Sequence, residues 1–115
     1  MTLRAPQPQM KPRDGALNYE IAQEKAAALG RLGRALEAAR AALADHDRTA
    51  GTKAASSAAR ERLLRQAGYA LWCFVVQREA CGLRDQRLIV RDYGVPREVQ
   101  NRMGVVGNSG RPAQA

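Results

Sequence analysis

The stretch LLRQAGYALWCFVV, residues 63–76, decides the fold, because at helical spacing it is apolar on two sides. One stripe holds Leu63, Leu64, Ala67, Leu71, Phe74 and Val75, and the second holds Tyr69, Trp72, Cys73 and Val76. A helix that is apolar on two sides must be covered on two sides. One neighbouring helix covers only the first stripe, so Tyr69, Trp72 and Val76 must be buried under C-terminal helices, against a second subunit, or by both.

A second long helix precedes this stretch. Over residues 16–44, apolar side chains recur at intervals of three and four: Ile21, Ala28, Leu29, Leu32, Leu36, Ala39 and Leu43. Asp14 is suited to cap its start, and residues 44–53 read as the connection, in which His46 is expected to face solvent. Gly30 and Gly33 lie mid-helix and indicate either close approach of another helix backbone, or a local kink or simple tolerance.

Shorter helical patterns follow. Ser56 or Ser57 caps the helix of residues 56–81, and Gly82 ends it. The next helix, 86–93, has Asp85 as its cap and Leu88, Ile89 and Tyr93 as its apolar set. The last, 96–103, begins at a proline, ends before Gly104 and turns Val99 and Met103 inward. The sequence therefore predicts an all-α fold, a long antiparallel helical hairpin with one or two short C-terminal helices.

The domain is expected to span residues 14–104, between tails 1–13 and 105–115 that are rich in Pro or Gly and predicted to be disordered. A core of this size is marginal on its own, and association is a common remedy. We therefore expect a homodimer, organised as a dimeric helical bundle.

Several classes of function find little support in the composition. One His and two Cys without a CxxC motif argue against a zinc site, and no Ser/His/Asp set or Gly-rich phosphate loop is present, so we expect neither an enzyme nor a cofactor. The longest apolar run is about half a membrane span, and the start lacks the apolar run of a signal peptide. A cytoplasmic protein without a membrane partner is expected.

Charged residues gather where the predicted hairpin closes. Arg78 points along the Leu stripe, and an antiparallel hairpin returns it to the start of the first helix. A buried Arg requires a carboxylate nearby, so Arg78 is predicted to meet Glu24 or Glu20, and Glu79 to meet Lys25. Two interpretations are open, a lock on the helix register or a polar pocket for a small anion; the lock is favoured.

The segment RDYGVPREVQNRMG, residues 91–104, raises the question of DNA binding. The candidate nucleic-acid contacts are Arg84, Arg87, Arg91, Arg97, Gln100 and Asn101. Arg reads guanine and Asn or Gln reads adenine in the major groove, but Val99 follows Gly94 by five positions, where helix-turn-helix segments usually have six. The alternative is a short docking helix with solvated polar side chains, and it is favoured.

The chain resembles a family of short bacterial helical proteins of unknown function. The resemblance rests on ALNYEIAQEKAAALGRLGRALEAA (16–39), LWCFVVQREACGLRD (71–85) and DYGVPREVQNRMG (92–104). It implies no activity or ligand, and it implies that the tails and residues 45–58 are the dispensable parts.

Two functions remain. The favoured one is a non-catalytic helical interaction or scaffold protein that acts as a homodimer. The alternative is a small basic nucleic-acid-binding protein with a helix-turn-helix-like C-terminal segment, consistent with the net charge of +8.

Overall fold

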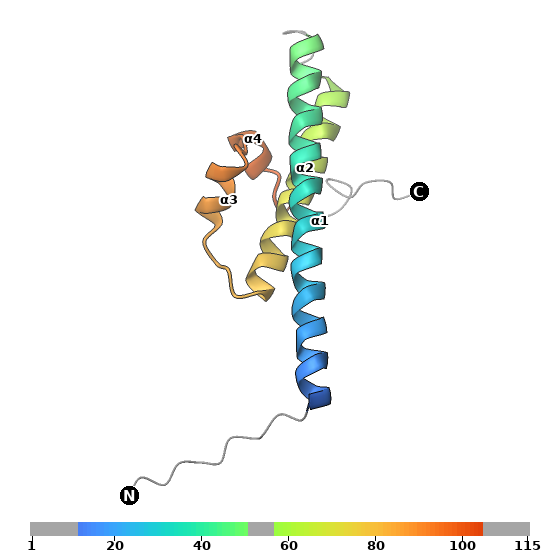
Figure 1. The fold of residues 1–115 in the computed structure, drawn as a ribbon. Helices are drawn as coiled ribbons and strands as arrows, with labels where there is room; N and C mark the ends of the chain where they lie inside the picture. The colour runs from blue at the N-terminus through green and yellow to red at the C-terminus, as the bar shows by residue number, and fades with distance from the viewer. Residues whose placement is uncertain (1–11, 51–56, 105–115) are drawn as a thin grey trace, which may run out of the picture.

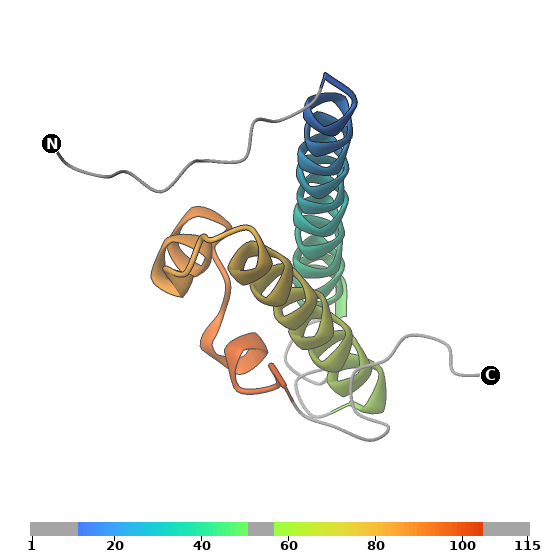
Figure 2. The same ribbon diagram turned by 90° about the horizontal axis from the view of Figure 1, so that it is seen from below.

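The computed structural model describes residues 12–50 and 57–104, which form four helices and no strand. These are α1 (Pro12–Ala50), α2 (Ala58–Ala80), α3 (Gln86–Asp92) and α4 (Arg97–Gln100). α1 and α2 form an antiparallel hairpin, and α3 and α4 lie beside α2 (Figures 1 and 2). The all-α hairpin with short C-terminal helices is thereby confirmed. Apart from the start of α1, the tails predicted to be disordered lie outside the described residues.

The hairpin is held by matched leucines. Leu36 and Leu43 of α1 are buried, as are Leu64 and Leu71 of α2. Each fully buried leucine removes enough apolar surface from water to contribute roughly 1.5–3 kcal/mol. The stripe predicted on the first helix is therefore its packing face over the part of α1 that α2 covers.

The C-terminal helices cover a further side of α2. Ile89 of α3 and Val99 of α4 are buried in the same core as Val75 of α2. The ring of Tyr93 meets that of Phe74 edge-on, with centroids 5.3 Å apart, an arrangement that aromatic pairs prefer. Leu88, predicted as part of the inner face of this helix, is instead 38 % exposed.

The ends of α2 and α3 carry the expected capping residues. The Ser57 Oγ accepts a hydrogen bond from the Arg60 N–H at 3.0 Å, and the Asp85 Oδ1 accepts one from the Arg87 N–H at 3.1 Å. Gly82, with φ of +85°, lets the Leu83 N–H return to the Arg78 carbonyl at 2.8 Å. That conformation is costly for any residue with a Cβ, which explains the stop at this glycine.

α1 is longer than predicted at both ends. It begins at Pro12, so Asp14 lies in its first turn and is not its cap. There the negative charge of Asp14 interacts favourably with the helix dipole. It continues to Ala50 instead of ending near residue 44, because Asp47 is bound by Arg60 and the Thr49 Oγ1 donates to the Asp45 carbonyl at 2.9 Å.

Two further expectations are corrected at the ends of the fold. α4 spans only Arg97–Gln100, and residues 101–104 form turns, because the Arg102 and Met103 N–H groups donate to carbonyls three positions back, those of Val99 at 3.0 Å and Gln100 at 3.1 Å. His46, expected in solvent, is half-buried, and its Nε2 has no hydrogen-bond partner.

Two helical glycines mark close approaches. A Cβ on Gly33 would stand 2.7 Å from the Tyr93 hydroxyl oxygen, and one on Gly68 would stand 2.6–2.9 Å from the Cβ and backbone of Arg102. A Cβ on Gly30 would meet only the flexible end of Arg34, at 3.2 Å. Close approach of side chains, not of another helix backbone, therefore explains Gly33, and tolerance explains Gly30.

Gly68→Ala is expected to destabilise the chain by about 1–3 kcal/mol, because the new methyl group would collide with the backbone of residue 102. Gly30→Ala is the matched control: it should be neutral or stabilise by up to about 1 kcal/mol through helix propensity. Urea unfolding followed by circular dichroism measures both. Equal effects of the two substitutions would contradict the packing of the C-terminal segment on α2.

Candidate functional site

α1 is longer than α2, the helix on which it packs. At a rise of 1.5 Å per residue, the 39 residues of α1 span about 58 Å and the 23 residues of α2 about 34 Å. Arg60 is bonded to Asp47, and the ring of Phe74 lies against Gly33. Continued at the same rise, α2 ends opposite about residue 27 of α1. About the first two-fifths of α1 therefore projects beyond the hairpin, as Figure 1 shows in blue.

We call residues 14–28 the overhang. Residues 16–27 are all exposed, and among them Leu17 is 54 % and Ile21 46 % exposed. Ile21 continues the apolar stripe that α2 covers further along α1, where Leu36 and Leu43 are buried, and Leu17, one turn before Ile21, lies at the edge of that stripe. One stripe is thus buried over one half of its length and bare over the other, the pattern of a surface awaiting a partner.

A second apolar area lies on α2. Trp72 is 43 % and Val76 45 % exposed, and Tyr69 is half-buried, its ring centroid 6.1 Å from that of Trp72. The described C-terminal segment reaches only the edge of this face: a Cβ on Gly104 would stand 3.9 Å from the Trp72 Cδ1. Of the two coverings expected for this face, the C-terminal helices provide little, and a second subunit stays a prediction.

The ion-pair cluster predicted around Arg78 does not form within the described chain. Glu24 is bonded to Arg31 at 3.2 Å, and Glu79 accepts a hydrogen bond from Gln86 at 3.5 Å. The Arg78 Nε is buried without a hydrogen-bond partner, and its guanidinium lies 5.8 Å from the centre of the Phe74 ring. The cation therefore rests on an aromatic face.

The reason for this error is the unequal length of the two helices. The prediction of this cluster requires the end of α2 to lie beside the start of α1. In the structure Glu20 and Lys25 lie on the overhang, since the end of α2 is opposite about residue 27.

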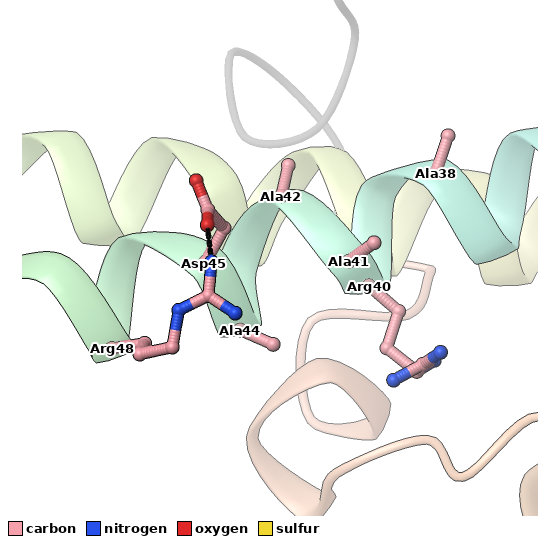
Figure 3. Close-up of a pocket in the computed structure, with 7 residues that line it drawn as sticks. All are labelled: Ala38, Arg40, Ala41, Ala42, Ala44, Asp45 and Arg48. Atoms are coloured by element: carbon pink, nitrogen blue, oxygen red, sulfur yellow. Dashed lines mark hydrogen bonds and ion pairs between the residues drawn. The ribbon is translucent and has the colours of Figure 1, made fainter.

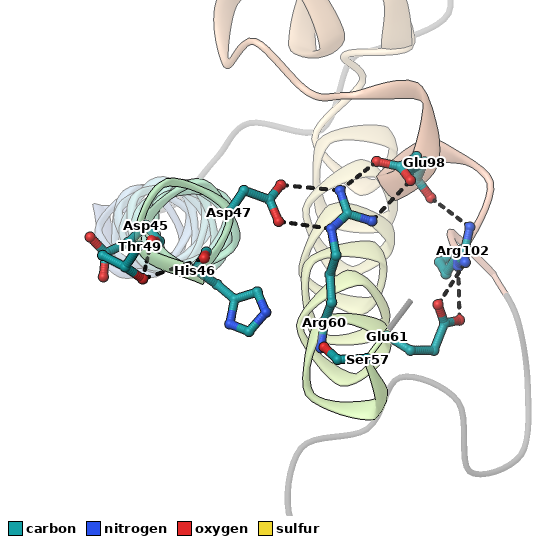
Figure 4. Close-up of polar contacts among 9 residues, drawn as sticks. All are labelled: Asp45, His46, Asp47, Thr49, Ser57, Arg60, Glu61, Glu98 and Arg102. Atoms are coloured by element: carbon teal, nitrogen blue, oxygen red, sulfur yellow. Dashed lines mark hydrogen bonds and ion pairs between the residues drawn. The ribbon is translucent and has the colours of Figure 1, made fainter. Parts of the chain in front are cut away.

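Arg60 forms the main polar junction instead. Its side chain is 12 % exposed and binds two carboxylates: that of Asp47 at 2.8 and 3.1 Å and that of Glu98 at 3.0 and 2.8 Å. Figure 4 shows this one guanidinium between α1 and α4. Such paired, charge-assisted contacts fix geometry as well as contributing energy.

A second pair reinforces the junction. The Arg102 guanidinium binds the Glu61 carboxylate at 3.1 and 2.7 Å and donates to the Glu98 carbonyl at 3.4 Å (Figure 4). Hydrogen bonds from Arg60 lower the pKa of Glu98 and of Asp47, and those from Arg102 lower the pKa of Glu61. Sequence patterns could not reveal this network, because its members lie far apart in the chain.

The candidate nucleic-acid contacts do not form one reading surface. Arg84 precedes α3 and so is not on a helical stripe with Arg87 and Arg91, which are paired with neighbouring acids, Asp85 and Asp92. Arg97 and Asn101 are exposed. The Gln100 side-chain amide donates a hydrogen bond to the Val95 carbonyl. The four-residue α4 is too short to serve as a recognition helix.

The structure has a hollow on its surface, among the described residues of α1. This hollow (Figure 3) is lined by Ala38, Arg40, Ala41, Ala42, Ala44, Asp45 and Arg48. Its lining is mostly methyl groups, and Arg48 is paired with Asp45. The described residues hold no group of three or more His, Cys, Asp or Glu suited to a metal, and none of their helices is long and apolar enough to cross a membrane.

Fold and surface together define a small all-helical hairpin protein with an uncovered apolar stripe. The family described as "Family of unknown function (DUF6665)" matches residues 7–111, and the chain belongs to that family. This agrees with the resemblance seen in the sequence. A search of the curated proteins finds no match. A search of the solved structures also finds none.

Arg60→Met is expected to lower the free energy of unfolding by about 1–2 kcal/mol, because two carboxylates lose their shared cation. The control is Arg87→Met, since Arg87 is 94 % exposed at its side chain and should change stability by at most about 0.5 kcal/mol. Urea titration at neutral pH measures both changes. A loss no larger than that of the control would show that the Arg60 junction holds nothing together.

Stability should also fall in acid. The pKa values of Asp47, Glu61 and Glu98 are lowered in the folded chain, so their contribution is present above the ordinary carboxylate pKa, about 4, and is lost as the pH falls through the lower folded values. Urea midpoints between pH 7 and about pH 2.5 measure this. Arg60→Met should flatten the decline; an equally steep decline in that variant would exclude the junction as its cause.

Proposed function

We propose that this protein is a small, non-catalytic helical interaction module that acts as a homodimer. The observation that carries the proposal is the uncovered stripe of the overhang, where Ile21 extends the packing face of α1 beyond the end of α2 and Leu17 is exposed beside it. A helix gains most of its stability from packing of its apolar face. Exposed apolar patches on small domains commonly mark sites of association.

The arrangement of the exposed apolar side chains supports the same proposal. Large exposed apolar side chains of the described residues fall into two areas, one on the overhang and one at and after the C-terminal half of α2. They are Leu17, Tyr19 and Ile21, and then Trp72, Val76, Leu83 and Leu88. Between these two areas, residues 29–49 of α1 and 58–71 of α2 keep their large apolar side chains buried or half-buried.

Charge favours a protein partner over nucleic acid. Residues 14–49 and 57–104 hold 14 Lys and Arg against 11 Asp and Glu, so most of the excess charge of +8 lies elsewhere in the chain. Nucleic-acid binding draws on a concentrated basic face, whereas Arg60, Arg87, Arg91 and Arg102 are engaged with carboxylates.

The test is the mass in solution. Sedimentation velocity at micromolar concentrations is expected to show a species of twice the monomer mass of 12.5 kDa that dissociates on dilution. A single species at the monomer mass across the whole concentration range would overturn the homodimer.

A further inference from the structure

We propose that two copies of this chain pair through their overhangs, with α1 running antiparallel to the α1 of the partner about a two-fold axis near residues 19 and 20. This inference rests on the homodimer proposed above and names the surface that forms it. Residues 14–25 of one copy would lie along residues 14–25 of the other, on the part of the stripe that α2 leaves open.

Continuity of packing is the first argument. Over residues 29–47 the stripe of α1 is covered by an antiparallel helix, α2, with Leu36 and Leu43 buried. Beyond the end of α2 the same stripe continues as Ala28 and Ile21, with Leu17 at its edge. A second antiparallel helix on this part of the stripe would continue the packing of α2 on α1. The overhang of another copy has the right length for this, because the two overhangs are identical.

The register of the apolar residues is the second argument. Leu17 and Ile21 are four positions apart and share one face of the helix. In an antiparallel pair centred on residue 19, Leu17 of each copy lies beside Ile21 of the other. An interface of this kind is self-complementary, and one two-fold axis closes it.

Charge is the third argument, and it points to the same centre. Asp14 and Lys25 lie about three helical turns apart and so share one side of the helix. Asp14 is two turns before Ile21 and Lys25 two turns before Leu32, which places both on the stripe, and the pair is centred between residues 19 and 20. Antiparallel pairing therefore sets Asp14 of each copy against Lys25 of the other. Like the apolar pair, this charge pair is repeated by the two-fold axis, and charges so placed select the orientation of the helices.

Charge reversal tests the register. Asp14→Lys and Lys25→Asp, each alone, would place like charges together at both ends of the interface and should raise the dimer dissociation constant about tenfold or more at low salt. Mixed in equal amounts, the two variants should form a heterodimer whose dissociation constant lies within about threefold of the parent value. Failure of the mixture to restore association would overturn the proposed pairing.

Apolar substitutions test the surface. Ile21→Asp is expected to raise the dissociation constant about a hundredfold, as loss of a central contact does. The matched control is Ala27→Asp, since Ala27 is exposed on the opposite side of the overhang, and it should dimerise like the parent. Circular dichroism at equal concentration confirms that the hairpin stays helical.

The outcomes separate this inference from the function on which it rests. If Trp72→Ala dissociates the dimer and Ile21→Asp does not, the homodimer stands, its interface is the outer face of α2, and the overhang pairing is wrong. If the parent chain sediments as a monomer at every concentration, both proposals fail.

Discussion

The packing of α1 on α2 is the interaction on which the rest of the structure depends. Leu36 and Leu43 meet Leu64 and Leu71 along one seam, and this seam orients every other element. Once it is formed, the other side of α2 is free for Ile89 and the helices that follow. The same seam also sets the length of α1 that α2 can cover. Because α1 is far the longer helix, a bare apolar stripe is a direct result of the packing.

Polar contacts join the end of α1 to the start of α2, where the apolar seam ends. Arg60 joins α1 to α4 through Asp47 and Glu98, and Arg102 joins the end of the described chain to α2 through Glu61. The two ends of the molecule thus differ in kind. One is closed by a network of charges, and the other presents exposed apolar side chains.

Much of the fold could be predicted from the sequence, because local rules govern it. Ser57 and Asp85 cap helices as expected, Gly82 ends one, and the period of Leu36 and Leu43 marks the buried face. The predictions that were wrong depended on the lengths of the helices. The cluster around Arg78 required two helices of equal length, and no local pattern revealed that α1 extends to Ala50.

The candidate site was only partly accessible to the same reasoning. Ile21 was recognised as part of the apolar stripe, but its exposure follows from where α2 ends, which is a tertiary fact. The partners of Arg60 lie 13 and 38 positions away along the chain, beyond the reach of helical spacing rules. Trp72 was correctly placed on a second face of α2, yet the sequence alone could not tell whether that face is covered within the chain.

The most direct measurement is amide hydrogen exchange across residues 14–28 at increasing protein concentration. If a second copy covers the overhang, protection of these amides rises with concentration, while that of the seam around Leu71 stays constant. Fast exchange of residues 14–28 that is the same at every concentration would contradict the central claim that the stripe of α1 is completed by another copy of the chain.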